Sequence, residues 1–465
     1  MVTKKEKINT VKKKPTKTKK EKTTKKSKET KKVPLTEKKV RTKKETTQKE
    51  EQKTTPTQQE QNTQTKTTCE NTHQPEINIG LIGHVDHGKT SLTKTLTGKW
   101  CDSHSEELKR GISIRLGYAD ATFYKIKSPS GIIYSNKKET ELGEIIGQRT
   151  ISIVDAPGHE TLMTTMLSGA ALMNGAILVI AANEKCPQPR TIEHLMALKF
   201  AGVEKIVVAQ NKVDLITREQ AIENYKSIKN FLKNYGYENA PIIPVSANFG
   251  TNLDLLIQAI EEHIPTKKYD STLPTKMFIA RSFDINKPGT KPNELKGGII
   301  GGSISQGEIK IGDQIELCPG FNGKKIIVKV TSLSTSTGPI NKATPGGLIA
   351  VGTTLDPSIT QGDRLRGMIA AKVDSLPNPT KNIELKLFLF DRMLEELHEN
   401  IKLKTTEPIV LTIGTNTAVG IVTKTDNKTA TVVLKNEVIV EKHEKVAISK
   451  NINGQWRLIA YAEIA

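Results

Sequence analysis

The sequence has little cysteine, few aromatic residues and no long apolar run. Only four of its 465 residues are cysteines, and these are widely separated, with no Cys-x-x-Cys pair. Such spacing argues against a disulfide framework and against a zinc site built from cysteines. No run of about 18 apolar residues is present, so no membrane partner is expected. The N-terminus also lacks an apolar signal core, which predicts a cytoplasmic protein rather than a secreted one.

Acidic and aromatic residues are distributed unevenly along the chain. Residues 1–76 contain no aspartate and no Phe, Trp or Tyr, but hold 23 lysines and arginines, ten glutamates and 19 threonines. Their net charge is +13, which leaves +7 for the other 389 residues. A segment with so few apolar side chains cannot bury a core. We therefore expect residues 1–76 to be a disordered basic tail, and the remainder to fold as about three domains.

Short apolar runs alternate with helical patterns from residue 77 to about residue 263. The predicted strands are 77–82, 151–154, 176–181, 206–209 and 242–245, and the predicted helices include 90–96, 191–200 and 221–232. Strands that are apolar throughout, with helices between them, are typical of a parallel sheet covered on both faces. This part of the chain is therefore predicted to be an α/β domain.

The pattern changes to all-β near residues 265–274, and a second block begins near residues 376–379. In both blocks, short β-branched strands alternate with glycine-containing turns. Two such blocks of roughly a hundred residues predict two β-barrels. The expected organisation is a tail over 1–76, an α/β domain over 77–270, and β-barrels over 274–378 and 379–465.

The segment GHVDHGKT at residues 83–90 matches the phosphate-binding pattern GxxxxGK[ST]. It follows a predicted strand and opens a predicted helix, which is the context that this pattern requires. Its glycines let successive backbone N–H groups face an anion, and the helix N-terminus adds partial positive charge. Lys89 can reach the outer phosphates, and the Thr90 hydroxyl can bind Mg²⁺. The candidate nucleotide ligands of this segment are Asp86, His87, Gly88, Lys89, Thr90 and Ser91.

Three further segments at predicted strand ends fit the same chemistry in the same order. Asp155 can hold Mg²⁺ through a water, and Gly158 can present its N–H to a γ-phosphate. Asp214 can accept hydrogen bonds from N1–H and N2–H₂ of guanine. Adenine offers neither donor, so its binding would leave a buried carboxylate unpaired. The candidate guanine ligands are Asn211, Lys212, Val213, Asp214, Ser246, Ala247 and Asn248.

Two polar residues are candidates for the hydrolytic step. The hydroxyl of Ser113, between the phosphate-binding segment and the next strand, could close over Mg²⁺ and release it after hydrolysis. An ordinary loop serine is the alternative interpretation. His159, directly after Gly158, is the candidate that positions the attacking water, and a loop histidine without a catalytic part is the alternative. His87 is a weaker candidate for that step, and we expect it to be a loop residue that is hydrogen-bonded nearby.

Taken together, these motifs resemble the translational GTPases, the group that includes elongation factor Tu. The segment WCDSHSEELKRGISIRLGYAD at residues 100–120 is similar to the gamma subunit of translation initiation factor 2, in its archaeal more than its eukaryotic form. Residues 282–290 and 455–459 resemble the same family. The likeness runs from about residue 77 to the C-terminus, and elongation factor Tu lacks the 100–120 pattern.

This resemblance implies a P-loop GTPase domain followed by two β-barrels, with GTP or GDP and Mg²⁺ as ligands. It also implies binding of initiator methionyl-tRNA, assembly with alpha and beta subunits, and delivery of the tRNA to the small ribosomal subunit. Hydrolysis after start-codon selection would then release the tRNA. In archaeal relatives, residues matching Asp86 and Gly111 are linked to a second Mg²⁺, beside the ion at Thr90 and Ser113.

The sequence departs from the family at one place. Many relatives carry two Cys-x-x-Cys pairs that form a zinc knuckle, but residues 124–149 contain no cysteine. We therefore expect no zinc bound by sulfur there.

Two other functions remain open from the sequence. A selenocysteine-specific elongation factor would also carry tRNA, and it would be expected to have a further domain after the second barrel, whereas this chain stops at Ala465. A nucleotide-gated scaffold would bind partners and hydrolyse GTP hardly at all.

Overall fold

A computed structural model describes residues 74–101, 116–159, 162–321, 323–389, 402–426, 428–452 and 454–465. The disorder expected for residues 1–73 therefore lies outside the described residues. Gln74 and Glu76, which composition assigned to the tail, make specific bonds. The Gln74 Nε2 donates to the carbonyl of Thr344 at 2.5 Å, and the Glu76 N–H donates to the carbonyl of Thr150 at 2.8 Å. Local composition could not reveal these contacts, because Thr344 lies 270 residues along the chain.

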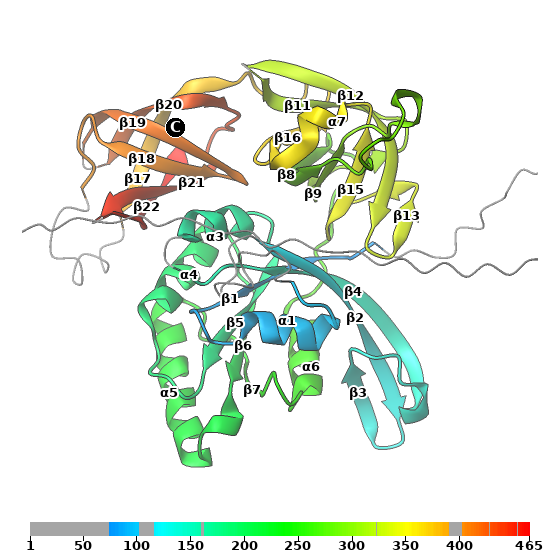
Figure 1. The fold of residues 1–465 in the computed structure, drawn as a ribbon. Coiled ribbons are helices and arrows are strands. Elements are labelled where there is room, and N and C mark those ends of the chain that lie inside the picture. Colours follow the sequence, from blue (N-terminus) through cyan, green and yellow to red (C-terminus); the bar gives the residue numbers. More distant parts are fainter. Residues whose placement is uncertain are drawn as a thin grey trace, which may run out of the picture. The chain divides into compact units, whose positions relative to one another are not determined.

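The first domain is built on a seven-stranded mixed sheet in the order β3-β2-β4-β1-β5-β6-β7 (Figure 1). Five of its strands run parallel, as the apolar runs predict: β1 (Asn78–Ile82), β4 (Glu144–Asp155), β5 (Gly175–Ala181), β6 (Ile206–Asn211) and β7 (Ile242–Pro244). Because parallel strands share one direction, the phosphate-binding segment and the polar segments after β4, β6 and β7 meet at one edge of the sheet.

An antiparallel extension at the edge of this sheet was not expected. β2 (Gly117–Ser128) pairs antiparallel with β4 and with β3 (Gly131–Ser135), and the 3₁₀ helix η1 (Thr140–Leu142) leads into β4. The parallel-rich sheet that the sequence predicts is confirmed, and the antiparallel strands β2 and β3 add to it. The antiparallel part was not expected because β2 alternates between buried and half-buried residues, and the first half of β4 between exposed and half-buried ones. Neither stretch has the continuous apolar run that marks a parallel strand.

Helices cover both faces of the sheet. Alternate residues along each strand point to opposite faces, so the strands contribute to two separate cores. One core packs against α1 (Lys89–Thr97) and α6 (Leu253–His263). The other packs against α3 (Met163–Ala170), α4 (Pro189–Phe200) and α5 (Arg218–Tyr235).

Local signals set the ends of α5, the longest of these helices. Thr217 and Gln220 form a reciprocal capping box at its start, and Gly236 ends it in the left-handed conformation with φ of 82°. The helix therefore extends by three residues at each end beyond the apolar pattern that predicted it.

The second domain is a six-stranded β-barrel. Its ring runs β11-β16-β8-β9-β15-β12 and is closed by pairing between β11 and β12. The ring strands are β8 (Lys276–Phe283), β9 (Ile299–Gln306), β11 (Gln314–Phe321), β12 (Lys324–Thr335), β15 (Ile349–Thr353) and β16 (Ile369–Lys372). The accessory elements are η4 (Pro292–Glu294), β10 (Ile309–Lys310), β13 (Gly338–Ile340), β14 (Lys342–Ala343), α7 (Pro357–Thr360) and η5 (Gln361–Asp363).

The third domain is a closed barrel in the order β17-β20-β19-β18-β21-β22. Its strands are β17 (Thr380–Leu389), β18 (Pro408–Ile413), β19 (Asn416–Thr425), β20 (Thr429–Val438), β21 (Lys445–Ile452) and β22 (Gln455–Ile464). Buried and exposed residues alternate along β19 and β20, as expected for strands with one face in a core and one in water. The prediction of two barrels is confirmed. In the described part of the chain, no helix has the length and apolar character needed to cross a membrane.

Candidate nucleotide-binding site

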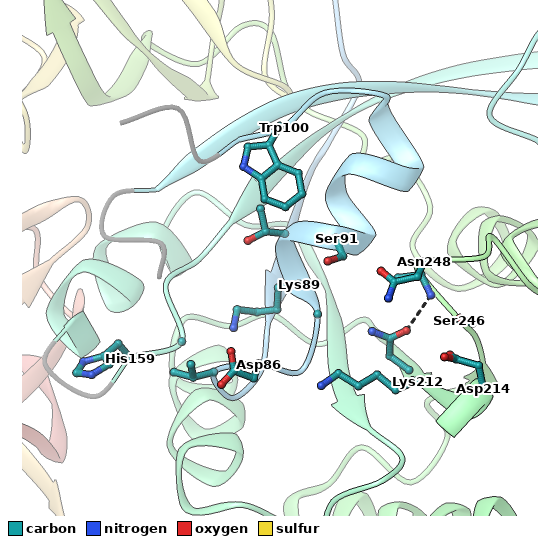
Figure 2. A pocket seen from close by; sticks show the side chains of 15 residues that line it. Asp86, Lys89, Ser91, Trp100, His159, Lys212, Asp214, Ser246 and Asn248 are labelled. Carbon is teal, nitrogen blue, oxygen red and sulfur yellow. Dashed lines mark hydrogen bonds between the residues drawn. The ribbon is translucent and has the colours of Figure 1, made fainter. Parts of the chain in front are cut away.

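A pocket of about 260 Å³ opens at the sheet edge where the predicted motifs meet. Figure 2 shows the side chains that line it. Thirteen predicted site residues contribute to its wall: Asp86, Gly88, Lys89, Thr90, Ser91, Gly158, His159, Asn211, Lys212, Asp214, Ser246, Ala247 and Asn248. Segments separated by up to 160 residues of sequence thus form one site, because the parallel strands end side by side.

The phosphate loop has the backbone shape of an anion site. Asp86 and Gly88 both have positive φ, at 62° and 91°. Gly88 is the N-cap of α1 and makes no side-chain cap, so the first N–H groups of the helix lack a capping side chain. The Lys89 ammonium lies above this loop and donates to the carbonyls of Gly83 at 2.9 Å and His84 at 2.8 Å. These bonds hold the cation beside the position that a phosphate would take.

Asn211 joins the phosphate loop to the segment that follows β7. Its Nδ2 donates to the carbonyl of His87 at 2.9 Å, and its Oδ1 accepts from the N–H of Ala247 at 2.9 Å. Figure 2 draws the second of these bonds. The side chain is 2% exposed. A Cβ on Gly88 would lie 2.4 Å from its Nδ2, so this close approach requires glycine. Asn211 therefore sets the spacing between the two loops.

We expect Asn211→Ala to weaken GDP binding by about 2–3 kcal/mol, because two buried partners lose their hydrogen bonds. The dissociation constant of a fluorescent GDP analogue measures this. Asn136→Ala is the matched control, since Asn136 Nδ2 also donates to two backbone carbonyls, those of Thr95 and Leu96 at the other end of α1. An equal loss of GDP affinity in both variants would contradict the role of Asn211 in linking the two loops.

Gly158 packs closely against the phosphate loop. A Cβ at this position would lie 2.4 Å from Lys89 Nζ and 2.9 Å from the Gly83 carbonyl oxygen. Asp155, at the end of β4, is buried and 1% exposed. The segment after β4 is thus held where its backbone faces the same space as the lysine, which fits the predicted contact with a γ-phosphate.

Several predicted residues lie elsewhere. The His87 side chain does not line the pocket: its Nδ1 is 3.0 Å from the Val179 carbonyl, and its Nε2 is 3.3 Å from Glu184 Oε2. These partners belong to β5 and the segment after it, and they turn the side chain away from the nucleotide, whereas the backbone of His87 stays a predicted ligand. Val213 is also absent from the wall. Gly111 and Ser113 lie outside the described residues.

The wall also contains residues that the motifs did not identify. Trp100 follows α1 and is 49% exposed, and Lys94 Nζ lies 5.4 Å from the centre of its ring. Its sequence signal was its place at the start of the family-specific segment 100–120, which did not assign it to the nucleotide pocket. His159 lines the pocket, but Figure 2 shows its imidazole turned away from Lys89. Positioning a water near the lysine would require this side chain to rotate.

A buried, neutral histidine accepts a hydrogen bond from the backbone of the phosphate loop. His194, on α4, is 1% exposed, and its Nδ1 accepts from the Gly83 N–H at 3.2 Å. Burial, with the Lys89 charge as a further cause, lowers the pKa of His194 to about 3. Burial likewise lowers the pKa of His84 and of His87. Since Nδ1 accepts a hydrogen bond, a neutral imidazole fits this position and an imidazolium does not.

Stability should fall as the pH drops below about 6.5. The unfolded chain binds a proton at His194 between pH 6.5 and pH 3, and the folded chain does not. Each such proton lowers the free energy of unfolding by about 1.4 kcal/mol per pH unit across this window. Urea unfolding at pH 7, 6 and 5 measures the slope. His194→Asn retains an acceptor oxygen and should flatten the slope, whereas an unchanged slope would contradict this assignment.

The oxygen donors of the site suit a hard cation. Among the described residues, no group of three or more His, Cys, Asp or Glu side chains could hold a metal ion. A Mg²⁺ site here would instead combine the Thr90 hydroxyl, the Asp155 carboxylate and phosphate oxygens, which are the ligands that Mg²⁺ prefers. The residues present therefore fit a nucleotide-bound Mg²⁺.

Comparison with known proteins identifies the family. Residues 74–266 match the Elongation factor Tu GTP binding domain, residues 297–370 match Elongation factor Tu domain 2, and residues 381–464 match Initiation factor eIF2 gamma, C terminal. The Translation initiation factor 2 subunit gamma of Methanococcus maripaludis is 52% identical over 405 residues, which are 84% of this chain and 99% of that protein. This chain belongs to the gamma-subunit family of translation initiation factor 2.

Two further relatives agree with this assignment. The proteins of the same name from Methanocaldococcus jannaschii and Archaeoglobus fulgidus are 50% and 49% identical, covering 84% and 83% of this chain and 98% and 93% of their own lengths. The family resemblance inferred from residues 100–120 is thereby confirmed. The chain is a translation initiation GTPase that binds GTP and GDP and hydrolyses GTP.

Solved structures show the same fold in other translational GTPases. A bacterial selenocysteine-specific elongation factor aligns with a TM-score of 0.65 and 26% identity over 84% of this chain and 58% of that chain. The elongation factor SelB of Methanococcus maripaludis, in complex with a GTP analogue, aligns with a TM-score of 0.63 and 21% identity over 85% of this chain and 80% of that chain. These identities are about half those of the gamma subunits, so the selenocysteine alternative is not favoured.

Proposed function

We propose that this GTPase binds initiator methionyl-tRNA in its GTP form and delivers it to the small ribosomal subunit. It acts in the cytoplasm as part of a heterotrimer with alpha and beta subunits, and GTP hydrolysis at start-codon selection releases the tRNA. The identity of about 50% to proteins named as gamma subunits supports this proposal. The structural observation that supports tRNA binding is a cleft between β2 and the second domain.

This cleft, of about 290 Å³, combines apolar walls with polar groups at its edge. Phe283 and Ile349 supply apolar surface, and Lys99 supplies positive charge. Arg281 also lines the cleft, where its Nε lies 2.9 Å from Asp363 Oδ1, and Asp120 adds a carboxylate. The Tyr118 hydroxyl is buried and has no hydrogen-bond partner among the described residues. Burial raises the pKa of Tyr118, so it remains a neutral donor. An apolar aminoacyl group on a phosphate-bearing RNA end matches these features, because the hydroxyl needs an acceptor and Lys99 can attract a phosphate.

The test replaces the buried hydroxyl alone. We expect Tyr118→Phe to weaken the binding of initiator methionyl-tRNA in GTP about five- to tenfold, the effect of losing one hydrogen bond of about 1–1.5 kcal/mol. GDP affinity should not change. Tyr225→Phe on the exposed face of α5 is the control, because Tyr225 is 38% exposed and outside the cleft. Equal tRNA affinity for wild type and Tyr118→Phe would remove the cleft from the proposal.

In the proposed hydrolysis, a water attacks the γ-phosphate of GTP in line with the departing GDP oxygen. The Lys89 ammonium stabilises the charge that develops on the phosphate oxygens, and the Gly158 N–H donates to the γ-phosphate. Thr90 and Asp155, with Ser113 when a γ-phosphate is bound, would hold Mg²⁺, which would supply further charge neutralisation. Asp86 and Gly111 are the candidates for a second ion. His159 orients the water after its side chain rotates toward the phosphate.

A nucleotide-gated scaffold would differ from this mechanism in one respect. It would bind the same ligands but would leave GTP intact when the small ribosomal subunit and start codon are present. Single-turnover hydrolysis with and without ribosomes separates the two functions. We expect hydrolysis to accelerate with the complete initiation complex, and no acceleration would favour the scaffold.

A further inference from the structure

A second polar pocket, of about 480 Å³, lies where the two barrels meet. It shares no lining residue with the nucleotide pocket or with the cleft at Tyr118. The β11–β12 turn and the segment after η5 contribute from the second domain. The start of β17, the β18–β19 turn and the end of β20 contribute from the third.

Contacts between the barrels shape this pocket. Lys276 Nζ of the second domain lies 2.9 Å from Glu441 Oε2 of the third, and Ile439 of the third domain packs into a core with Ile369 of the second. Gly367 has φ of 86°, and a Cβ there would lie 3.0 Å from the Asn416 Cα. Only glycine permits this close approach. The pocket is therefore formed by packed surfaces and does not depend on a ligand to draw the barrels together.

Positive charge dominates the wall. Arg364, Arg366, Lys381 and Lys435 line it, against one carboxylate, that of Glu437. The two guanidinium groups each donate once, to the Ser358 carbonyl and to the Ser168 hydroxyl, both at 3.2 Å. Because a guanidinium carries five N–H donors, both groups keep donors for a ligand. In the described part of the chain, neither lysine side chain has an ion pair or hydrogen bond.

An exposed aromatic ring lies beside these cations. Phe321, at the end of β11, is 42% exposed and lines the pocket. The side-chain amides of Asn416 and Asn436 line the same space and can pair with base edges. Cations that attract phosphate, beside a ring on which a base can stack, form the usual surface for unpaired nucleotides.

We propose that this pocket binds a nucleotide phosphate together with its unpaired base. The arginines and lysines contact the phosphate, and the base stacks on Phe321. The same chemistry is offered by a single-stranded RNA segment and by a free mononucleotide. A duplex does not fit it, because paired bases are not free to stack on a side chain.

Fluorescence anisotropy with a labelled single-stranded 12-nucleotide RNA tests this in the full chain, saturated with GDP to fill the nucleotide pocket. Arg364→Ala combined with Lys435→Ala should weaken RNA binding at least tenfold and reduce the slope of log affinity against log salt by about 1.4, since two phosphate contacts are lost. Phe321→Ala should weaken binding about tenfold with little change in that slope. The control is Lys226→Ala combined with Lys229→Ala, on the exposed surface of α5.

Competition by AMP and by a matched RNA duplex distinguishes a single-stranded RNA ligand from a free mononucleotide. Displacement by single-stranded RNA but not by millimolar AMP identifies an RNA segment as the ligand, and displacement by AMP identifies a free nucleotide. Photo-crosslinking of 4-thiouridine RNA should label the peptide that contains Phe321. Thermal unfolding and GDP affinity confirm that each variant is folded. Unchanged RNA affinity in the folded variants, equal competition by duplex, or crosslinks only to other peptides would overturn the proposal.

Discussion

Asp214→Asn is expected to weaken GTP binding by about 2–4 kcal/mol, the scale of removing one partner of a hydrogen-bonded charge contact. Asp214 lies in η3 (Val213–Leu215), lines the nucleotide pocket and has an exposed side chain. Its carboxylate can accept from both guanine donors, whereas an amide presents one acceptor and one donor group. The C2 carbonyl of xanthine suits that amide donor. The variant should therefore gain affinity for xanthine nucleotides relative to guanine nucleotides.

Competition of GTP and XTP against a fluorescent GDP analogue measures both effects. Asp254→Asn is the matched control, because Asp254 is an exposed carboxylate in the first turn of α6 that does not line the pocket. It should leave both affinities unchanged. If the Asp214 variant bound GTP as tightly as the wild type, this carboxylate would not be the guanine contact.

Lys89→Ala should reduce the affinity for both GTP and GDP by about 3–5 kcal/mol. The Lys89 side chain is 7% exposed and already lies beside the phosphate loop, so little ordering is needed before it contacts phosphate. Removing the ammonium group removes its charged hydrogen bonds to phosphate, each worth about 1.5–3 kcal/mol. Water has little access to this position and cannot fully replace these bonds.

Isothermal titration with GDP and with a non-hydrolysable GTP analogue measures this change. Lys233→Ala, in the exposed last turn of α5, removes a charge of the same sign away from the pocket and should have no effect. Comparable losses in the two variants would mean that long-range charge, rather than contact with Lys89, sets the affinity. Retained affinity in Lys89→Ala would remove this lysine from the phosphate site.

Much of the nucleotide site could be predicted because its residues occur in short motifs at strand ends. Once β1, β4, β6 and β7 were predicted to be parallel, their polar ends had to meet. The same motifs could not assign the linking role of Asn211, which depends on Ala247 and His87 in two other segments. They also placed His87 among the ligands, although its ring faces Val179 and Glu184.

Features that depend on contacts between distant segments could not be predicted from sequence patterns. In the antiparallel extension, β2 alternates buried with half-buried residues and β3 has no buried residue, so neither strand has a continuous apolar run. Composition assigned Gln74 to the tail, because its hydrogen-bond partner Thr344 lies in the second domain, far along the chain. The pocket between the barrels requires a particular approach of Gly367 to Asn416, and no local pattern encodes that approach.

We propose that this chain is a GTP-dependent carrier of initiator tRNA. Filter binding of initiator methionyl-tRNA and of elongator tRNAs, each in GTP and in GDP, measures this property. We predict tight binding only for initiator methionyl-tRNA with GTP, and binding at least tenfold weaker when either the tRNA or the nucleotide is changed, a difference of at least about 1.4 kcal/mol. Equal affinity for initiator and elongator tRNAs, or equal affinity in GTP and GDP, would contradict the account.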